Sequence, residues 1–255
     1  MAAPTRVGGS GSGIGTSTRA TGSLSWSTGD VVFVLGITAD NSYTLSTPTT
    51  AGSGLTFAAV SSTPTNVASS CKAYAWTATA SASSSGTISS SVTPSSNHGA
   101  IIAWVYSGSD GLGATAISAA LGSTTTQNLT RGQANSMVVQ IWGDWNAVND
   151  TTVTWTPTGE TQMLAQFQTG QMTSFGADWG DQGGTGTTAY GFSGFAGGDM
   201  TAITLEVKGT AAGGGSTILR QMMQHHHYRR PMKRTDAGLV LPTHREVLRD
   251  WKRAA

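Results

Sequence analysis

The chain has 255 residues, of which 38% are hydrophobic and 11% are charged, with eight Trp and a single Cys. Disordered chains combine few aromatics with high net charge, so this composition excludes disorder and predicts a packed body. One cysteine excludes an intrachain disulfide, and the apolar surroundings of Cys71 predict a buried side chain. No apolar run follows Met1 or is long enough to span a bilayer, so neither a signal peptide nor a membrane partner is expected.

Residues 1–22 are rich in Gly, Ser and Thr and have few apolar anchors, which predicts a flexible N-terminal arm. From 23 to 210, short strand-like segments alternate with Gly, Pro, Asn, Asp or Ser, and none has a helical period. Regular short strands of this kind indicate an all-β fold. We expect one jelly-roll-like, two-sheet β-sandwich domain over 23–210.

The pattern inside individual segments predicts which faces are buried. "DVVFVLGI" and "AIIAWVY" are continuous apolar runs, typical of central strands covered on both sides. "CKAYAWTAT" should place Tyr74 and Trp76 on one face, opposite Cys71, Ala73 and Ala75. "TAITLEVKG" alternates apolar with polar side chains and predicts one buried and one solvated face.

The chain changes character after residue 210. Residues 1–212 hold five basic and ten acidic groups (net −5), whereas residues 213–255 hold nine basic and three acidic groups (net +6). A Gly-rich hinge leads into "QMMQHHHYRRPMKR", where Pro231 disfavours a helix. Thr243 and Glu246 have capping-box spacing, so we expect a short amphipathic helix at about 244–253. Residues 211–255 therefore form a basic tail suited to docking on an acidic surface.

Within this tail we expect two groups of anchoring residues. One is the basic cluster and the other is the apolar face of the short helix; together they comprise Arg229, Arg230, Lys233, Arg234, Val247, Leu248 and Trp251. The His225–His227 triplet is an alternative candidate, but consecutive residues on an extended chain point to alternate sides, so no metal site or other cofactor is expected. Few aromatics accompany the basic residues, so a nucleic-acid partner is less expected than a protein partner.

Carboxylates next to tryptophan form a second candidate site. Asp144 precedes Trp145 in "GDWN", and Asp178, Trp179 and Asp181 lie in "ADWGDQGG". Such a set suits turns at strand ends, contact with a glycan, or Ca²⁺ binding with backbone oxygens. A glycosidase would need a placed pair of carboxylates, and no other catalytic motif accompanies these residues, so no catalytic residue is expected. The turn interpretation is favoured, with glycan contact as the alternative.

Several stretches together resemble a domain of virion proteins from tailed phages of actinobacteria, which are described as minor tail or structural proteins. They are "SWSTGDVVFVLGITADN", "AYAWTATASASSSGTISSS", "IIAWVYSGSDGLGA", "GADWGDQGGTGTTAYG" and "TAITLEVKG", and the resemblance covers about residues 22–210. It implies a non-enzymatic β-sandwich assembled in the host cytoplasm into a phage particle. The alternatives are a capsid decoration protein on the head surface and a carbohydrate-binding adhesin. Expected partners are other virion proteins, contacted through 213–255, further copies of the chain (most simply a trimer) and a host surface glycan.

Overall fold

The computed structural model describes residues 2–61, 63–64, 71–118, 124–146, 152–169, 171–180, 183–195, 198 and 200–210. Every regular element in these residues is a β-strand. The all-β fold class predicted from the short strand-like segments is therefore confirmed. The strands lie in one compact unit, Met1–Gly213.

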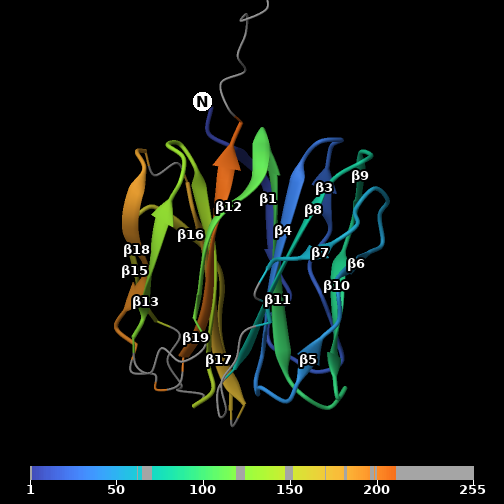
Figure 1. Ribbon diagram of the computed structural model, residues 1–255. Helices are drawn as coiled ribbons and strands as arrows, with labels where there is room; N and C mark the ends of the chain where they lie inside the picture. The colour runs from blue at the N-terminus through green and yellow to red at the C-terminus, as the bar shows by residue number, and fades with distance from the viewer. Residues whose placement is uncertain are drawn as a thin grey trace, which may run out of the picture. The chain divides into compact units, whose positions relative to one another are not determined.

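The strands form four layers (Figure 1). The first inner sheet contains, in spatial order, β1 (Thr5–Gly11), β11 (Gly99–Ser107), β4 (Val31–Thr38), β8 (Lys72–Thr79) and β7 (Ala58–Ala59). The first outer layer contains β2 (Thr18–Ala20), β10 (Ile88–Thr93) and β5 (Thr44–Leu45), with β6 (Thr49–Thr50) also paired to β10, and the separate pair β3 (Leu24–Trp26) and β9 (Ser84–Gly86).

The second inner sheet contains, in spatial order, β12 (Ser109–Ser118), β19 (Met200–Gly209), β14 (Met137–Asp144), β17 (Met172–Trp179) and β16 (Glu160–Gln168). The second outer sheet contains β13 (Thr126–Arg131), β18 (Gly186–Ser193) and β15 (Thr154–Thr156). Gly108 alone connects the last strand of the first half to the first strand of the second half, and it has a φ of 63°. A single residue with positive φ suffices to send the chain from one inner sheet to the other.

The two halves repeat one strand arrangement. Eight principal strands of the first half (β1, β2, β4, β5, β7, β8, β10 and β11) correspond in chain order to β12 through β19. If each set is numbered from 1 to 8, both inner sheets have the order 1-8-3-6-5 and both outer sheets the order 2-7-4. The body is thus two β-sandwiches packed together rather than the one two-sheet sandwich that we expected. Strands that are apolar on both faces need a neighbouring layer on each side, and a single two-sheet sandwich covers only one face of each sheet.

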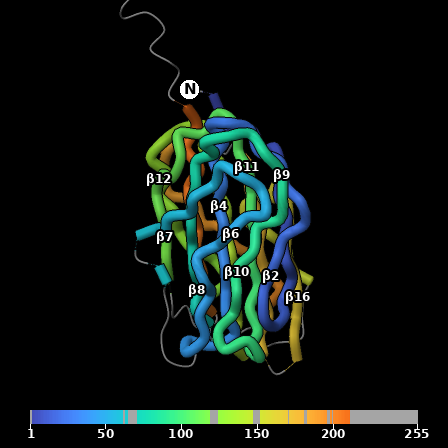
Figure 2. The backbone as a smooth tube through the Cα atoms, turned by 90° about the vertical axis from the view of Figure 1, so that its right-hand side faces the viewer, coloured from blue at the N-terminus to red at the C-terminus, as the bar shows by residue number. Residues whose placement is uncertain are grey.

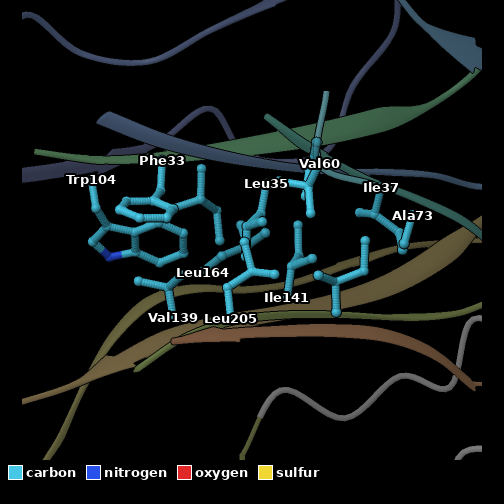
Figure 3. Close-up of a cluster of buried hydrophobic side chains, with 14 of the residues drawn as sticks. Phe33, Leu35, Ile37, Val60, Ala73, Trp104, Val139, Ile141, Leu164 and Leu205 are labelled. Atoms are coloured by element: carbon cyan, nitrogen blue, oxygen red, sulfur yellow. The ribbon is translucent and has the colours of Figure 1, made fainter. Parts of the chain in front are cut away.

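Three hydrophobic clusters occupy the spaces between the four layers. The central cluster joins the two inner sheets and includes Phe33 and Leu35 from one sheet and Ile141 and Leu205 from the other (Figure 3). The other two clusters fill the space between each inner sheet and its outer sheet. The central strands of both inner sheets are therefore covered on both faces, which explains why β4, β11, β14 and β17 are buried along almost their entire lengths.

Burial tests the predictions made from the strand patterns. Strands β4 and β11 are central and covered on both sides, as their apolar runs predicted. In β8, Tyr74 and Trp76 enter the first outer cluster while Ala73 and Ala75 enter the central one, which confirms the predicted division of faces. The prediction of a solvated face on β19 is wrong, because the second outer sheet covers the side that carries Thr204 and Glu206.

Residues 1–22, expected to form an arm, instead contribute two strands to the sheets. β1 pairs with β11 from Thr5 to Gly11, with a bulge between Arg6 and Gly8. The glycines of β1 allow a close approach to the inner core, because a Cβ on Gly9 would lie 2.8 Å from the Met163 side chain and 3.1 Å from that of Trp104. Backbone pairing holds this segment, so it needs few apolar side chains of its own.

The described body has two distinct ends. Gly209 lies against Ala2, and the Thr210 amide donates to the Gly108 carbonyl, so the first and last described residues share one end, which we call the terminal end (Figures 1 and 2). β4 and β14 both run away from it, because Val31 pairs with Tyr106 and Met137 pairs with Val207. The opposite end, which we call the loop end, therefore carries the connections that follow Thr38 and Asp144.

Candidate functional site

Two connections, one from each half of the body, meet at the loop end. Asp40 follows β4, and Trp145 follows β14. The Trp145 side chain lies close enough to the Asp40 carboxylate to help lower the pKa of that group, so the two halves approach each other here. Trp145 is 38% exposed, whereas the six other tryptophans of the body are buried: Trp26, Trp76, Trp104, Trp142, Trp155 and Trp179. The described part of the loop end thus presents one exposed indole beside a carboxylate.

The Asp40 carboxylate is held in its charged form. Its Oδ1 accepts hydrogen bonds from the backbone amide and the hydroxyl of Ser42, each at 2.8 Å. Partial burial alone would raise the pKa of Asp40, but these two bonds and the neighbouring Trp145 side chain outweigh burial and lower the pKa. At neutral pH the indole therefore lies beside a carboxylate anion.

The turn that carries Trp145 is fixed by its own acidic residue. Asp144 is 1% exposed, and its Oδ1 accepts from the Asn146 amide at 3.2 Å and from the Gly198 amide at 3.4 Å. This is the Asx-turn role predicted from the sequence for a carboxylate at a strand end. Burial raises the pKa of the nearby Cys71 thiol, and the negative charges of Asp144 and Asp40 raise it further.

Asp178 and Trp179 do not belong to the loop end. Trp179 is completely buried in the second outer cluster, and its Nε1 donates to the Pro157 carbonyl at 2.7 Å. The expectation that it could stack against a glycan is therefore wrong. Asp178 lies inside β17 and is 2% exposed, so the prediction that it shapes a turn is wrong as well. Asp181, the third member of that motif, lies outside the described residues.

The strand register separates the two candidate carboxylates. Asp144 pairs with Thr173 on β17, and Asp178 lies five residues further along the same strand. Five residues of strand span about 16 Å. The paired carboxylates of glycosidases lie about 5–9.5 Å apart, so Asp144 and Asp178 do not form such a pair.

Asp178 instead forms an ion pair between the two halves, with Arg6 of β1. Its other oxygen, Oδ2, accepts from the Tyr106 hydroxyl at 3.3 Å. Burial raises the pKa of Asp178, while Arg6 and Tyr106 oppose the rise without cancelling it. This partnership could not be predicted from the sequence, because Arg6 lies 172 residues away in a segment expected to be an arm.

A second structural carboxylate is Glu206 of β19. Its Oε2 accepts from the amides of Ala114 and Gly132 at 2.8 and 3.1 Å, and its Oε1 accepts from the Gln133 amide at 3.0 Å. Burial alone would raise the pKa of Glu206, but these bonds outweigh burial and lower it. The carboxylate satisfies three backbone donors that the strand ladders leave unpaired, which explains a buried charge in an apolar strand.

We expect Glu206→Gln to lower the free energy of unfolding by about 2 kcal/mol at neutral pH, because an amide replaces an anion that accepts three bonds. The lowered pKa gives stability that is complete above the ordinary value of 4.5 and is lost as the pH falls through the folded-state value. Urea unfolding should therefore show the difference between variant and wild type shrinking below about pH 4.5. Glu160→Gln, on the edge strand β16, is the matched control and should change stability little at either pH. An equal loss at every pH would contradict this role.

The seven anchoring residues of 213–255 and the His225–His227 triplet lie outside the described residues. Among the described residues, no group of three His, Cys, Asp or Glu side chains is placed to hold a metal ion. That same part of the chain contains no helix that could cross a bilayer.

At the loop end, two candidate residues from the sequence, Asp144 and Trp145, lie near Asp40, which the sequence did not single out. Asp40 follows an apolar strand just as Asp144 does, and this equivalence was the signal that could have identified it. Compared with known proteins, the chain matches no family model, no curated protein and no solved structure.

Proposed function

We propose that this chain is a non-enzymatic structural protein of a phage virion, tail-associated, with residues 213–255 anchoring it to the particle and the loop end exposed. The observation that carries the proposal is the polarity of the body. The chain leaves β19 at the terminal end, beside Ala2, whereas Asp40 and Trp145 lie at the opposite end. The C-terminal extension therefore begins at the end of the body opposite these loops.

The distribution of charge supports the attachment. Residues 1–212 have a net charge of −5 and residues 213–255 a net charge of +6, so the extension suits an acidic partner surface. Burial of Val247, Leu248 and Trp251 would contribute about 5 kcal/mol before the cost of ordering the segment. Because fixing each residue costs about 1–2 kcal/mol, one copy would bind weakly. We therefore propose that copies of the chain associate, most simply as a trimer, and bind by avidity.

A role without catalysis fits the buried acidic residues. Asp178 pairs with Arg6, and Glu206 accepts from three backbone amides, so both are committed to holding the fold. Asp144 holds the turn that carries Trp145. Each of these carboxylates accepts hydrogen bonds or an ion pair that stabilises the fold, and protonation during catalysis would weaken those interactions.

We also propose that each half is a jelly roll. The strand order 1-8-3-6 within the inner sheet, with 2-7-4 in the outer one, is the arrangement of two interlocked Greek keys; strand 5 joins the inner sheet. Jelly rolls are common in viral capsid and lectin domains, which is consistent with a virion protein that contacts a surface. The resemblance of residues 22–210 to minor tail proteins favours the tail over the head.

Deletion of residues 213–255 tests the anchor. We expect a soluble, folded body that no longer joins particles, measured by mass spectrometry of purified virions from a phage that carries the truncated gene. Trp251→Ala should weaken incorporation, and charge reversal at Arg229 and Arg230 should weaken it in a salt-sensitive manner. Trp145→Ala, at the loop end, is the control and should incorporate normally. Full occupancy by the truncated protein would reject the anchor.

A further inference from the structure

We propose that Trp145 is the stacking platform of a binding site for a neutral pyranose sugar, with Asp40 as the residue that positions the indole and accepts hydrogen bonds from sugar hydroxyls. The proposal rests on the proposed function only in naming what the exposed loop end binds. The first observation behind it is the exposure of the Trp145 side chain. Among the described residues, Val7 and Trp145 are the large hydrophobic side chains that remain exposed, at 51% and 38%.

Residues from both halves of the body surround the indole. Its side chain lies beside Asp40, which Ser42 holds through two hydrogen bonds, and its backbone lies in the turn fixed by Asp144. An exposed tryptophan with no such supports would lose rotamer freedom on binding. A ring already oriented binds at a smaller entropic cost.

The surrounding chemistry selects the class of ligand. Among the described residues of this end, Asp40 and Asp144 lie near the indole, whereas Lys72, which pairs with Thr38, is directed toward the Tyr74 ring. The negative charges nearest the indole therefore disfavour phosphates, nucleic acids and acidic sugars by repulsion. The polar groups beside the ring belong to Ser42 and Asn146, which are exposed. A pyranose has an apolar C–H face that suits an indole ring and hydroxyls at its rim that suit carboxylate, amide and hydroxyl partners.

A protein partner fits this end less well. Protein interfaces are built around a contiguous apolar core that excludes water, usually with several aromatic or aliphatic anchors. Among the described residues, the loop end offers one exposed indole, and the other exposed large hydrophobic residue, Val7, lies on β1 near the terminal end. One ring in polar surroundings matches the size of a single sugar unit.

Saturation-transfer NMR of the full-length protein with the methyl glycosides of galactose, glucose and mannose tests the site. We expect transfer to the ring C–H protons of at least one glycoside. Trp145→Ala should weaken its binding by about tenfold, which corresponds to about 1.4 kcal/mol. Trp145→Phe keeps a smaller ring, so its affinity for the glycoside should lie between those of the wild type and Trp145→Ala. Asp40→Asn should weaken binding by a smaller factor than Trp145→Ala because the ring remains but loses its anion partner.

Val7→Ala is the matched control, because it removes the other exposed apolar side chain and should leave sugar binding unchanged. Absence of transfer to all three glycosides, or equal affinities of Trp145→Ala and wild type, would overturn the proposal. The virion experiment reports separately. If the wild-type protein binds none of the glycosides but still needs residues 213–255 to join particles, the sugar site alone is rejected. If it binds a glycoside through Trp145 but joins particles without residues 213–255, the anchor alone is rejected.

Discussion

Replacing Arg6 by Met is expected to lower the free energy of unfolding by about 3 kcal/mol, the cost of leaving a buried carboxylate without its counter-charge. Asp178 is 2% exposed between the two inner sheets, and Arg6 is its ion-pair partner. Met keeps most of the packing volume of the Arg side chain, so the loss should report on charge. Urea unfolding at pH 7 followed by tryptophan fluorescence measures it.

The pH dependence of this loss has a definite sign. Burial already raises the pKa of Asp178, and removal of Arg6 takes away the largest opposing influence, so the pKa rises further in Arg6→Met. A raised folded-state pKa means that stability is retained where the carboxyl is protonated and is lost as the pH rises through that pKa. The deficit of Arg6→Met should therefore be smaller in mild acid than at pH 7.

The double variant with Asp178→Asn supplies the control for the ion pair. It removes the orphaned charge, so it should recover part of the stability lost in Arg6→Met. Arg19→Ala removes another basic side chain from the same N-terminal region and should cost less. A deficit in Arg6→Met that is the same at all pH values and persists in the double variant would show that Arg6 acts through packing alone.

Trp104→Ala is expected to destabilise both halves together, by about 4 kcal/mol. Trp104 is completely buried in the central cluster, where it packs between the two inner sheets (Figure 3). Because that cluster is shared, a cavity there should raise the free energy of the whole body and not only of the half that carries the residue. This tests the prediction from the sequence that residues 23–210 form one cooperative domain.

Hydrogen exchange distinguishes one cooperative body from two. The Val92 amide donates to Ser17 in the first outer layer, and the Phe192 amide donates to Thr125 beside the second outer sheet. If both open only by global unfolding, Trp104→Ala should accelerate both by the same factor, about a thousandfold. Acceleration at Val92 alone would show that the halves unfold separately. Trp145→Ala, which removes an equal volume from an exposed site, should leave both rates unchanged.

Local sequence pattern was sufficient for the fold class and for several strand faces. The apolar runs of β4 and β11 predicted central strands, and the alternation in β8 separated Tyr74 and Trp76 from Ala73 and Ala75. These predictions succeed because side chains alternate along any strand, whatever its partners. The Asx turn at Asp144 was predictable for the same reason, since the side chain bonds to its own neighbouring backbone.

The number of layers was decided only by tertiary packing. A strand buried on both faces has the same apolar pattern whether it lies in a two-sheet or a four-layer body, so the sequence could not reveal that two sandwiches share a core. Glu206 is one example. Its alternation with Leu205 and Val207 predicted that its face of β19 is solvated, but the second outer sheet covers that face. Arg6 is another example, because a Gly-rich strand held by backbone pairing resembles an arm.

By itself, the sequence determined an all-β body, its buried strands, a charge reversal after residue 210 and the presence of Asp-Trp motifs. Tertiary structure alone decided which motif reaches solvent: Trp145 lies at the loop end, whereas Trp179 is enclosed between two sheets. It also brought together Asp40 with Trp145, and Arg6 with Asp178. The physical reason is that local patterns fix a residue's direction relative to its own strand, whereas exposure and ion pairing depend on what other strands place opposite it.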